Sequence, residues 1–390
     1  MPSALTPRER LLAVLRHGVA DRLPWAPKFS TWFQAHERRG DLPTILRGCE
    51  HWYDAARLLG VDIFDKCGPV YRPRFASVRV TEDLRGRYRV TRHITPLGEL
   101  STVREEVEDY AHTVYLVEYP IKRAEDLRIY RYLLEDTVYE PCYEDFLEAD
   151  RRIGDDGLTM TNLPDSPLHR IFVDLMGYEV GSYAFADDPK GMDGLCQHIL
   201  EKNEEAYRTA LDSPAEVLLT PENTNSDFES PALFRRYAFP TFKRASDLAH
   251  AHGKLHWVHA CGKLRALLPQ FLESGIDGVE SLTPPPYADT PLDLARATWH
   301  GRITIDGGIS PHLLVEDLAP GELDAEVVDL LRRMAPGDNF VLSVSDDTPT
   351  NARLERIIRI GELVREYGKL PIDASIGATA ATSPAEGHRD

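Results

Sequence analysis

Short β-prone runs alternate with longer helical segments along this chain of 390 residues, and this alternation constrains the fold more than any other feature. Apolar residues recur at mostly three- and four-residue steps over residues 230–251, 262–274 and 324–335, which predicts amphipathic helices between the later runs. Alternating strands and helices imply parallel strands joined by right-handed crossovers. The eight β-prone runs are residues 23–27, 61–65, 158–162, 217–222, 255–259, 275–281, 302–306 and 340–345.

Eight strand–helix units predict an α/β fold with a closed TIM barrel of eight parallel strands and outer helices. A doubly wound open sheet is the competing fold, but the chain has no Gly-rich dinucleotide-binding fingerprint to support it. We expect residues 1–372 to form one barrel domain. An extra N-terminal helix precedes the barrel, because residues 6–9 form a capping box with Pro7 in the first turn.

Two segments depart from the alternation. Residues 86–118 carry β-rich runs around Pro96-Leu97-Gly98, which predicts an antiparallel insertion after the second strand, over about residues 86–150. Residues 124–148 within it are acidic, and we interpret them as helical. Residues 373–390 are rich in Ala, Ser, Thr and Gly, which predicts a disordered tail.

Composition excludes several classes of partner. The net charge of −18 argues against nucleic acid or an anionic membrane surface as the main partner. No apolar run approaches the about 18 residues of a membrane-spanning helix, and the polar first ten residues do not resemble a signal peptide. The five cysteines are sparse and form no Cys-x-x-Cys pair, so we expect a reducing, cytoplasmic location rather than a disulfide framework.

Ionisable and polar residues end the last five predicted strands. The carboxyl ends of the strands of a TIM barrel meet at one face, where active sites form. These side chains are therefore expected to converge there. The strand-end residues are Glu222, Asn223, His259, Cys261, Glu280, Asp306 and Asp346.

The pair His259-x-Cys261 predicts a metal site, because imidazole and thiolate are preferred zinc ligands. Glu222 or Glu280 is expected to supply an oxygen ligand, and Glu222 is the residue we assign to this set. A zinc with three protein ligands keeps one open position for a thiol or water. The alternative is that the pair occurs by chance and that Cys261 is a small apolar filler.

Glu222, Glu280 and Asp346 are the candidate catalytic carboxylates, as acid, base or orienting group. Each has a structural alternative in a helix cap or a turn. The candidate substrate contacts are Trp25, Lys28, Asn223, Tyr287 and Asp306. Tyr287 follows three consecutive prolines that fix a loop, and Trp25 and Lys28 lie in or just after the first strand, where core packing is the alternative.

Several segments carry a resemblance to one family. They are residues 6–16 with 21–25, residues 59–62, residues 230–234 with Pro240, Gly253-Lys254, and His259-Ala260-Cys261-Gly262 followed by Gly275-Ile276-Asp277. Together, from about residue 5 to 372, they resemble the uroporphyrinogen decarboxylase superfamily. The resemblance implies a TIM barrel.

Two branches of that superfamily bear on the function. The tetrapyrrole decarboxylases carry an Arg-rich N-terminal signature, and here the corresponding residues 25–32 lack it. The other branch comprises zinc-dependent methyltransferases that work with corrinoid proteins, often with His-x-Cys and a later Cys near strand eight. His259 and Cys261 match the first part, whereas residues 342–347 contain no Cys, so Glu222, Glu280 or Asp346 would have to complete the site.

The resemblance implies a methyltransferase that moves a methyl group between a small-molecule donor and a corrinoid or thiol acceptor, with zinc at the barrel mouth. No corrinoid-binding motif is present in the chain, so the corrinoid is expected on a separate carrier protein. The alternative is a metal-independent decarboxylase or lyase that acts on a small carboxylated substrate. A third reading is a binding protein without chemistry. The oligomeric state is left open, with a homodimer as one option.

Overall fold

The computed structural model describes residues 4–107 and 114–377. Its main sheet has seven parallel strands in the order β1-β8-β9-β10-β11-β12-β13. The strands are β1 (Ile63–Lys66), β8 (Gly157–Asn162), β9 (Val217–Thr220), β10 (Leu255–His259), β11 (Gly278–Leu282), β12 (Thr304–Ile309) and β13 (Phe340–Val344).

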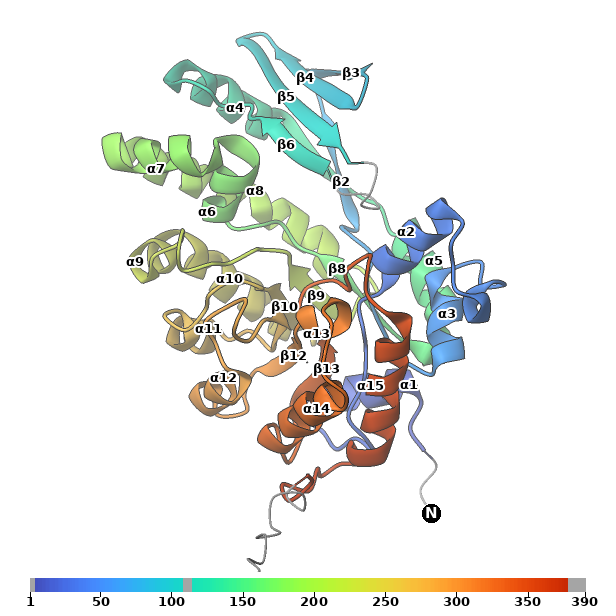
Figure 1. Ribbon diagram of the computed structural model, residues 1–390. Helices are drawn as coiled ribbons and strands as arrows, with labels where there is room; N and C mark the ends of the chain where they lie inside the picture. The colour runs from blue at the N-terminus through green and yellow to red at the C-terminus, as the bar shows by residue number, and fades with distance from the viewer. Residues whose placement is uncertain (1–3, 108–113, 378–390) are drawn as a thin grey trace, which may run out of the picture.

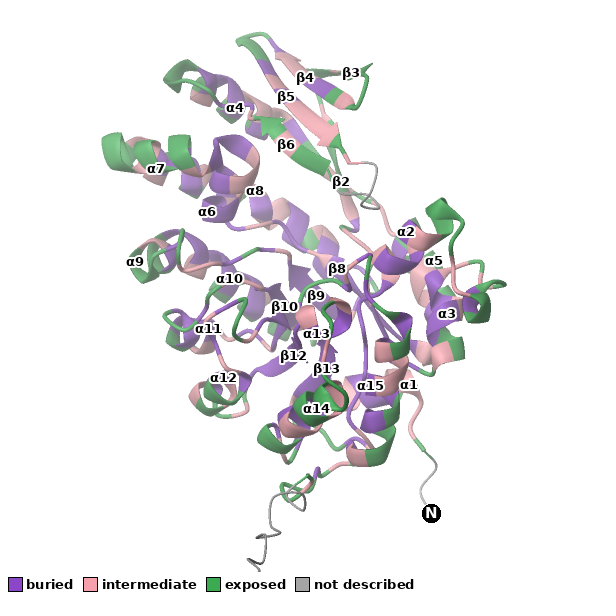
Figure 2. Cartoon of the chain, viewed as in Figure 1, coloured by how far each residue is buried: buried purple, intermediate pink, exposed green. Residues whose placement is uncertain are grey.

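Strands β9 to β13 are almost entirely buried, as the purple colour of the sheet in Figure 2 shows. Near-continuous apolar runs suit a parallel sheet covered on both faces. Each of these seven strands overlaps a predicted run, with ends that differ by a few residues. Strand β9 ends at Thr220 rather than at residue 222, because Pro221 has no N–H to continue the ladder.

The first predicted strand, residues 23–27, is present as a single bridge rather than a strand. Trp25 forms a parallel bridge with Leu342 of β13. The amide of Ala26 donates to the Leu342 carbonyl at 3.0 Å, and the Trp25 carbonyl accepts from the amide of Asp62, next to β1, at 2.8 Å. This segment thus lies between the two edges of the seven-stranded sheet and gives the fold its TIM-barrel-like form.

The helices, most of which pack around this sheet, are drawn in Figure 1. They are α1 (Pro7–Leu15), α2 (Ser30–Arg39), α3 (Trp52–Leu59), α4 (Ala124–Asp136), α5 (Glu144–Ile153), α6 (Pro167–Arg170), α7 (Gly177–Asp187), α8 (Pro189–Leu211), α9 (Pro231–Leu233), α10 (Phe239–Ala251), α11 (Leu268–Ser274), α12 (Leu292–Trp299), α13 (His312–Val315), α14 (Glu322–Arg333) and α15 (Leu354–Tyr367). Short 3-10 turns occupy Thr44–Leu46 and Gly154–Asp156, and π-helical turns follow α6 at Ile171–Leu175 and α9 at Phe234–Ala238.

Helix α1 begins as predicted, with a complete capping box between Thr6 and Glu9. The predicted helix over residues 262–274 is shorter, because α11 starts only at Leu268. The amides of Leu264 and Arg265 donate instead to the Asp289 carboxylate, at 2.9 and 3.2 Å.

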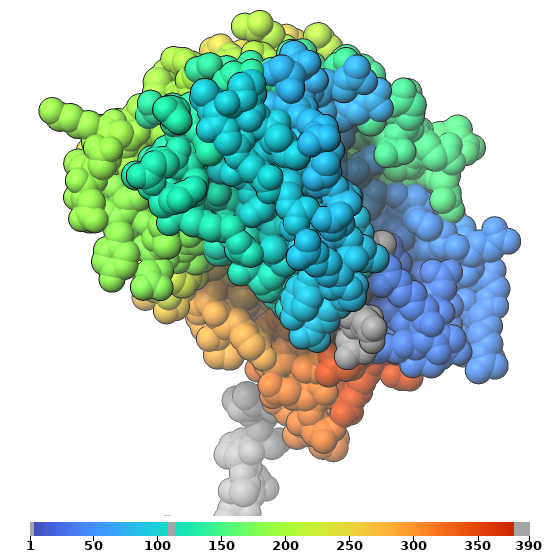
Figure 3. All heavy atoms as spheres, turned by 90° about the horizontal axis from the view of Figure 1, so that it is seen from above, coloured from blue at the N-terminus to red at the C-terminus, as the bar shows by residue number. Residues whose placement is uncertain are grey.

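Between β1 and β8 lie two antiparallel ladders, at the top of Figure 1 and over the middle of the face in Figure 3. One pairs β2 (Tyr71–Phe75) with β7 (Thr137–Pro141), and the other joins β3 (Arg79–Arg85), β4 (Tyr88–Thr95), β5 (Gly98–Glu106) and β6 (Val114–Glu118). The helical prediction for residues 124–148 is corrected, because β7 separates α4 from α5.

Within the described residues, no helix combines the length and apolar character needed to cross a bilayer. Residues 373–377, the described part of the predicted tail, form a turn with Ser375 bonded to Asp373. The rest of that predicted tail lies outside the described residues.

Candidate metal site at the carboxyl ends of the strands

His259 and Glu280 meet because adjacent strands hold them in register. His259 ends β10, Glu280 lies within β11, and the two residues are direct partners in the parallel ladder. The Nδ1 atom of His259 and the Glu280 carboxylate form a short hydrogen bond, and both side chains are buried. The bond to Nδ1 leaves Nε2 as the ring nitrogen available to a ligand or metal.

Lys28 connects two buried carboxylates at this end of the sheet. Its Nζ lies 2.6 Å from Oε1 of Glu280 and 2.7 Å from Oδ1 of Asp306 on β12. The Ser281 hydroxyl accepts from Lys28 at 2.7 Å and donates to Glu280 at 2.9 Å, and Lys66 at the end of β1 lies 3.4 Å from Glu280. Glu280 thus has cations on one side and His259 on the other.

These contacts set the protonation of the cluster. Burial raises the pKa of Glu280, but Lys28, Lys66 and His259 outweigh it and hold that pKa well below its usual range. Burial lowers the pKa of His259, but the Glu280 carboxylate and the Cys261 side chain raise it to about 9. Burial raises the pKa of Asp306, and this effect exceeds the stabilisation that Lys28 gives its charged form.

His259, Cys261 and Asp346 bring one potential ligand atom each to a common place, with all three atoms within 4.8 Å of one another. Imidazole, thiolate and carboxylate are the three ligand types that zinc takes in proteins. A ligating His usually donates its other ring N–H to a carboxylate, and Glu280 occupies that position behind His259. The donor set and its supporting shell therefore fit zinc.

Backbone strain accompanies this cluster. Asp346 has φ 69° and Ser281, which follows Glu280, has φ 72°. Left-handed backbone at residues other than glycine costs of order 1–3 kcal/mol and collects at functional sites. At Asp346 the chain turns directly after β13, so the strained turn determines where this carboxylate lies.

Glu222, the third ligand predicted from the sequence, lies outside the group formed by His259, Cys261 and Asp346. Its side chain is fully buried, and one carboxylate oxygen accepts a short hydrogen bond from the Ser166 amide at the start of α6. The other oxygen has no hydrogen-bond partner among the described residues. Burial raises the pKa of Glu222 to about 8, with Glu229 beside it as a second cause, and burial raises the pKa of Glu229 to about 8 as well.

These two carboxyl groups predict a pH-dependent stability. Both carry protons in the folded chain that the unfolded chain, with a pKa of 4.5, releases. The contribution of these two groups to the free energy of unfolding is fully present below pH 4.5. It is lost as the pH rises through about 8. We expect the free energy of unfolding, measured by urea denaturation across this range, to fall with pH, and to fall less steeply in a Glu222→Gln, Glu229→Gln double variant.

The matched control is Glu326→Gln, since Glu326 is exposed on α14. This variant should keep the wild-type slope. Equal slopes for wild type and the double variant would contradict the assignment.

The other predicted site residues have different positions. Trp25 is 1% exposed and lies in the main core, which agrees with the core-packing alternative rather than with a substrate contact. Lys28 and Asp306 are buried in the ion-pair cluster. Asn223 is exposed and accepts from Cys261 Sγ at 3.8 Å. Tyr287 is exposed on its proline-rich loop, with its ring 5.9 Å from that of His312, and its role stays a prediction.

The sequence reasoning missed His169. Its side chain is buried on α6, its Nδ1 has no partner among the described residues, and burial together with the neighbouring His259 lowers its pKa to about 4. The sequence feature that could have indicated this position is Ser166-Pro167, which marks the start of a helix just after β8. Lys66 was likewise not among the predicted site residues, and its side chain belongs to the Glu280 cluster.

The fold and the cluster define a TIM-barrel-like α/β protein with a candidate metal site at the carboxyl ends of its strands. The model of the family Uroporphyrinogen decarboxylase (URO-D) matches residues 171–367, about half of the chain. The chain therefore belongs to the uroporphyrinogen decarboxylase family. The matched region contains His259, Cys261, Glu280 and Asp346.

Solved structures support the fold. A methyltransferase from Methanosarcina mazei is 14% identical and aligns over 93% of this chain and 99% of its own, with a TM-score of 0.58. A B12-independent methionine synthase from Shewanella sp. W3-18-1 is 13% identical over 88% of this chain and 97% of its own, but its TM-score of 0.41 is too low to carry an argument. No curated protein matches the chain.

Proposed function

We propose that this chain is a zinc-dependent methyltransferase that moves a methyl group between a small-molecule donor and a corrinoid or thiol acceptor. The observation that carries the proposal is the group formed by His259, Cys261 and Asp346, with Glu280 behind the imidazole. The similarity in fold to the methyltransferase from Methanosarcina mazei supports it. The corrinoid would be carried by a separate protein, and the site of action would be cytoplasmic.

The proposal gives separate roles to the residues of the cluster. His259, Cys261 and Asp346 would hold zinc, which when bound lowers the pKa of a coordinated thiol and so favours its nucleophilic form. Glu280 would keep the proton on Nδ1 of His259 and so leave Nε2 to bind the metal. Lys28 and Lys66 neutralise Glu280 and hold it in place. The cobalt chemistry would belong to the corrinoid.

The proposal is tested by metal content and methyl transfer together. We expect about one zinc per chain in protein purified without a chelator or a His-tag, because three protein ligands form one site. Methylcobalamin and a small thiol serve as probes, with the loss of the methylcobalamin spectrum as readout. A chelator should abolish the reaction and added zinc should restore it.

Two outcomes would overturn the methyltransferase proposal. One is a wild-type chain without metal, and the other is turnover that a strong chelator does not change. Either result would favour the metal-independent decarboxylase. The feature that favours this second candidate is Lys66, a cation beside Glu280 and close to Asp346 and Asp347, where the carboxylate of a substrate could bind.

A further inference from the structure

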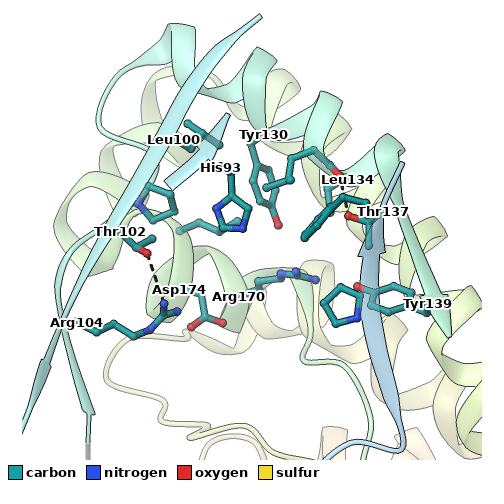
Figure 4. Close-up of a pocket in the computed structure, with 15 residues that line it drawn as sticks. His93, Leu100, Thr102, Arg104, Tyr130, Leu134, Thr137, Tyr139, Arg170 and Asp174 are labelled. Atoms are coloured by element: carbon teal, nitrogen blue, oxygen red, sulfur yellow. Dashed lines mark hydrogen bonds between the residues drawn. The ribbon is translucent and has the colours of Figure 1, made fainter. Parts of the chain in front are cut away.

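A cavity of about 290 Å³ lies between the antiparallel insertion and the segment that follows β8 (Figure 4). Strands β4 and β5 form one wall, α4 and β7 another, and α6 with its π-helical turn a third. Most of the lining is apolar, with Phe75, Leu100, Leu134 and Leu175 among the residues. Its volume is close to the lower end of the about 300–1,000 Å³ range of small-molecule sites.

Two arginines line this cavity. The side chains of Arg104 from β5 and Arg170 from α6 both belong to its wall, and Asp174 is the one acidic residue that lines it. Within residues 4–107 and 114–377, neither guanidinium has a carboxylate within the 4.0 Å of an ion pair; Arg104 donates only to the Thr102 hydroxyl, at 3.5 Å. Two positive charges against one negative charge leave an excess of one positive charge, which a monoanion would neutralise.

The phenol group of Tyr130 adds a polar contact at the same place. Tyr130 is 4% exposed, and its hydroxyl points from α4 into the cavity toward Arg170 in Figure 4. This hydroxyl interacts with the Arg170 guanidinium, which can only donate, and it has no hydrogen-bond acceptor among the described residues. Buried hydroxyl groups are normally paired, so a hydroxyl donor that lacks an acceptor and points into a cavity indicates a missing ligand.

The local helix geometry explains why Arg170 faces the cavity. Arg170 ends α6 and immediately precedes the π-helical turn Ile171–Leu175, which also carries Asp174. Such turns are rare and often lie at functional sites. The preceding residue, His169, does not line the cavity, and its imidazole interacts with His259 of the metal site. The lining of the cavity also contains none of His259, Cys261, Glu280 and Asp346, so the cavity is separate from the metal site.

A neighbouring cavity contains Asp165, which also interacts with Arg170. Burial raises the pKa of Asp165 well above its usual range, with Glu222 as a further cause, so its neutral form is favoured. Arg170 also interacts with Asp174 and with the hydroxyls of Tyr130 and Tyr139, all of which line the cavity.

We propose that the cavity is a second binding site for a small monocarboxylate with an apolar or aromatic body. Arg170 and Arg104 would bind the carboxylate, the Tyr130 hydroxyl would donate a hydrogen bond to it, and the apolar walls would cover the rest of the molecule. A guanidinium presents paired N–H donors that match the two oxygens of a carboxylate.

Benzoate is the probe, and isothermal titration calorimetry on the full chain is the measurement. We expect benzoate to bind, and its uncharged analogue benzamide and inorganic phosphate to bind at least about tenfold more weakly, because benzamide lacks the charge and phosphate the apolar body. Arg170→Met should lower benzoate affinity by about tenfold or more. Tyr130→Phe should lower it by about tenfold while the melting temperature stays equal or rises, since the lost hydroxyl has no acceptor in the free protein.

Arg128→Met is the matched control, because Arg128 is exposed on the same helix as Tyr130 and lies outside the cavity lining. This variant should bind benzoate as the wild type does. Cys261→Ser should also bind it normally, which separates this site from the metal site.

The proposal would be overturned if the wild type did not bind benzoate, or if it bound benzoate and benzamide equally. It would also be overturned if Arg170→Met and Tyr130→Phe left benzoate binding unchanged. Benzoate binding that disappears in Cys261→Ser would place the probe at the metal site and would equally overturn it.

Discussion

Replacing Lys28 with methionine is expected to lower the free energy of unfolding by about 3–5 kcal/mol. Lys28 is 8% exposed and lies within 2.7 Å of two fully buried carboxylates, those of Glu280 and Asp306. Methionine has a similar length, so the main loss is the charge. Without it, Glu280 retains Lys66 at 3.4 Å, whereas Asp306 keeps no ion-pair partner among the described residues. Urea denaturation followed by tryptophan fluorescence measures the change.

The control for this variant is Lys190→Met on α8, at an exposed position, which should change stability by less than about 0.5 kcal/mol. Adding Asp306→Asn to Lys28→Met should recover part of the loss, because it removes the buried charge that Lys28 no longer balances. A loss below about 1 kcal/mol in Lys28→Met would contradict the idea that this cluster is a desolvated ion pair.

Cys261→Ser is expected to remove zinc from the chain. A serine hydroxyl is a far weaker zinc ligand than a thiolate, so the fall in affinity should exceed the about 100-fold that loss of a supporting residue costs. Cys261 is only partly buried, and its contact with Asn223 is long, at 3.8 Å. The fold should therefore survive the change. Zinc content by mass spectrometry and methyl transfer from methylcobalamin are the two readouts, and they should fall together.

Cys142→Ser is the matched control, because Cys142 is a partly buried cysteine outside the cluster of potential ligands. It should retain about one zinc per chain, as expected for an intact three-ligand site. Zinc content that is unchanged in Cys261→Ser would show that the metal binds elsewhere. Zinc lost without any loss of turnover would separate the metal from the reaction.

The barrel-like fold could be predicted because its signals are local. Parallel strands that are buried on both faces appear as short apolar runs, and seven such runs coincide with β1 and β8 to β13. The first run was different, since residues 23–27 contribute one bridge with Leu342 and hydrogen bonds to both neighbours. The pattern of β-prone residues does not distinguish a full strand from such a segment.

The candidate site could be predicted in part. The rule that strand ends form one face identified His259, Cys261, Glu280, Asp306 and Asp346 together. The choice between Glu222 and Asp346 as the third ligand depends on side-chain direction, which the sequence does not give. Glu222 points to the amide at the start of α6, whereas a left-handed backbone at residue 346 directs Asp346 toward His259 and Cys261.

By itself, the sequence determined the order of the strands and helices, the residues at the strand ends and the family. Apolar periodicity, helix caps and the order of short motifs are properties of neighbouring residues, so they can be read along the chain. Only the tertiary structure decided that Lys28 joins Glu280 to Asp306 and that Arg170 meets Arg104 across a cavity. These contacts join residues far apart in the chain, and they depend on strand register and on the direction of each turn after a strand.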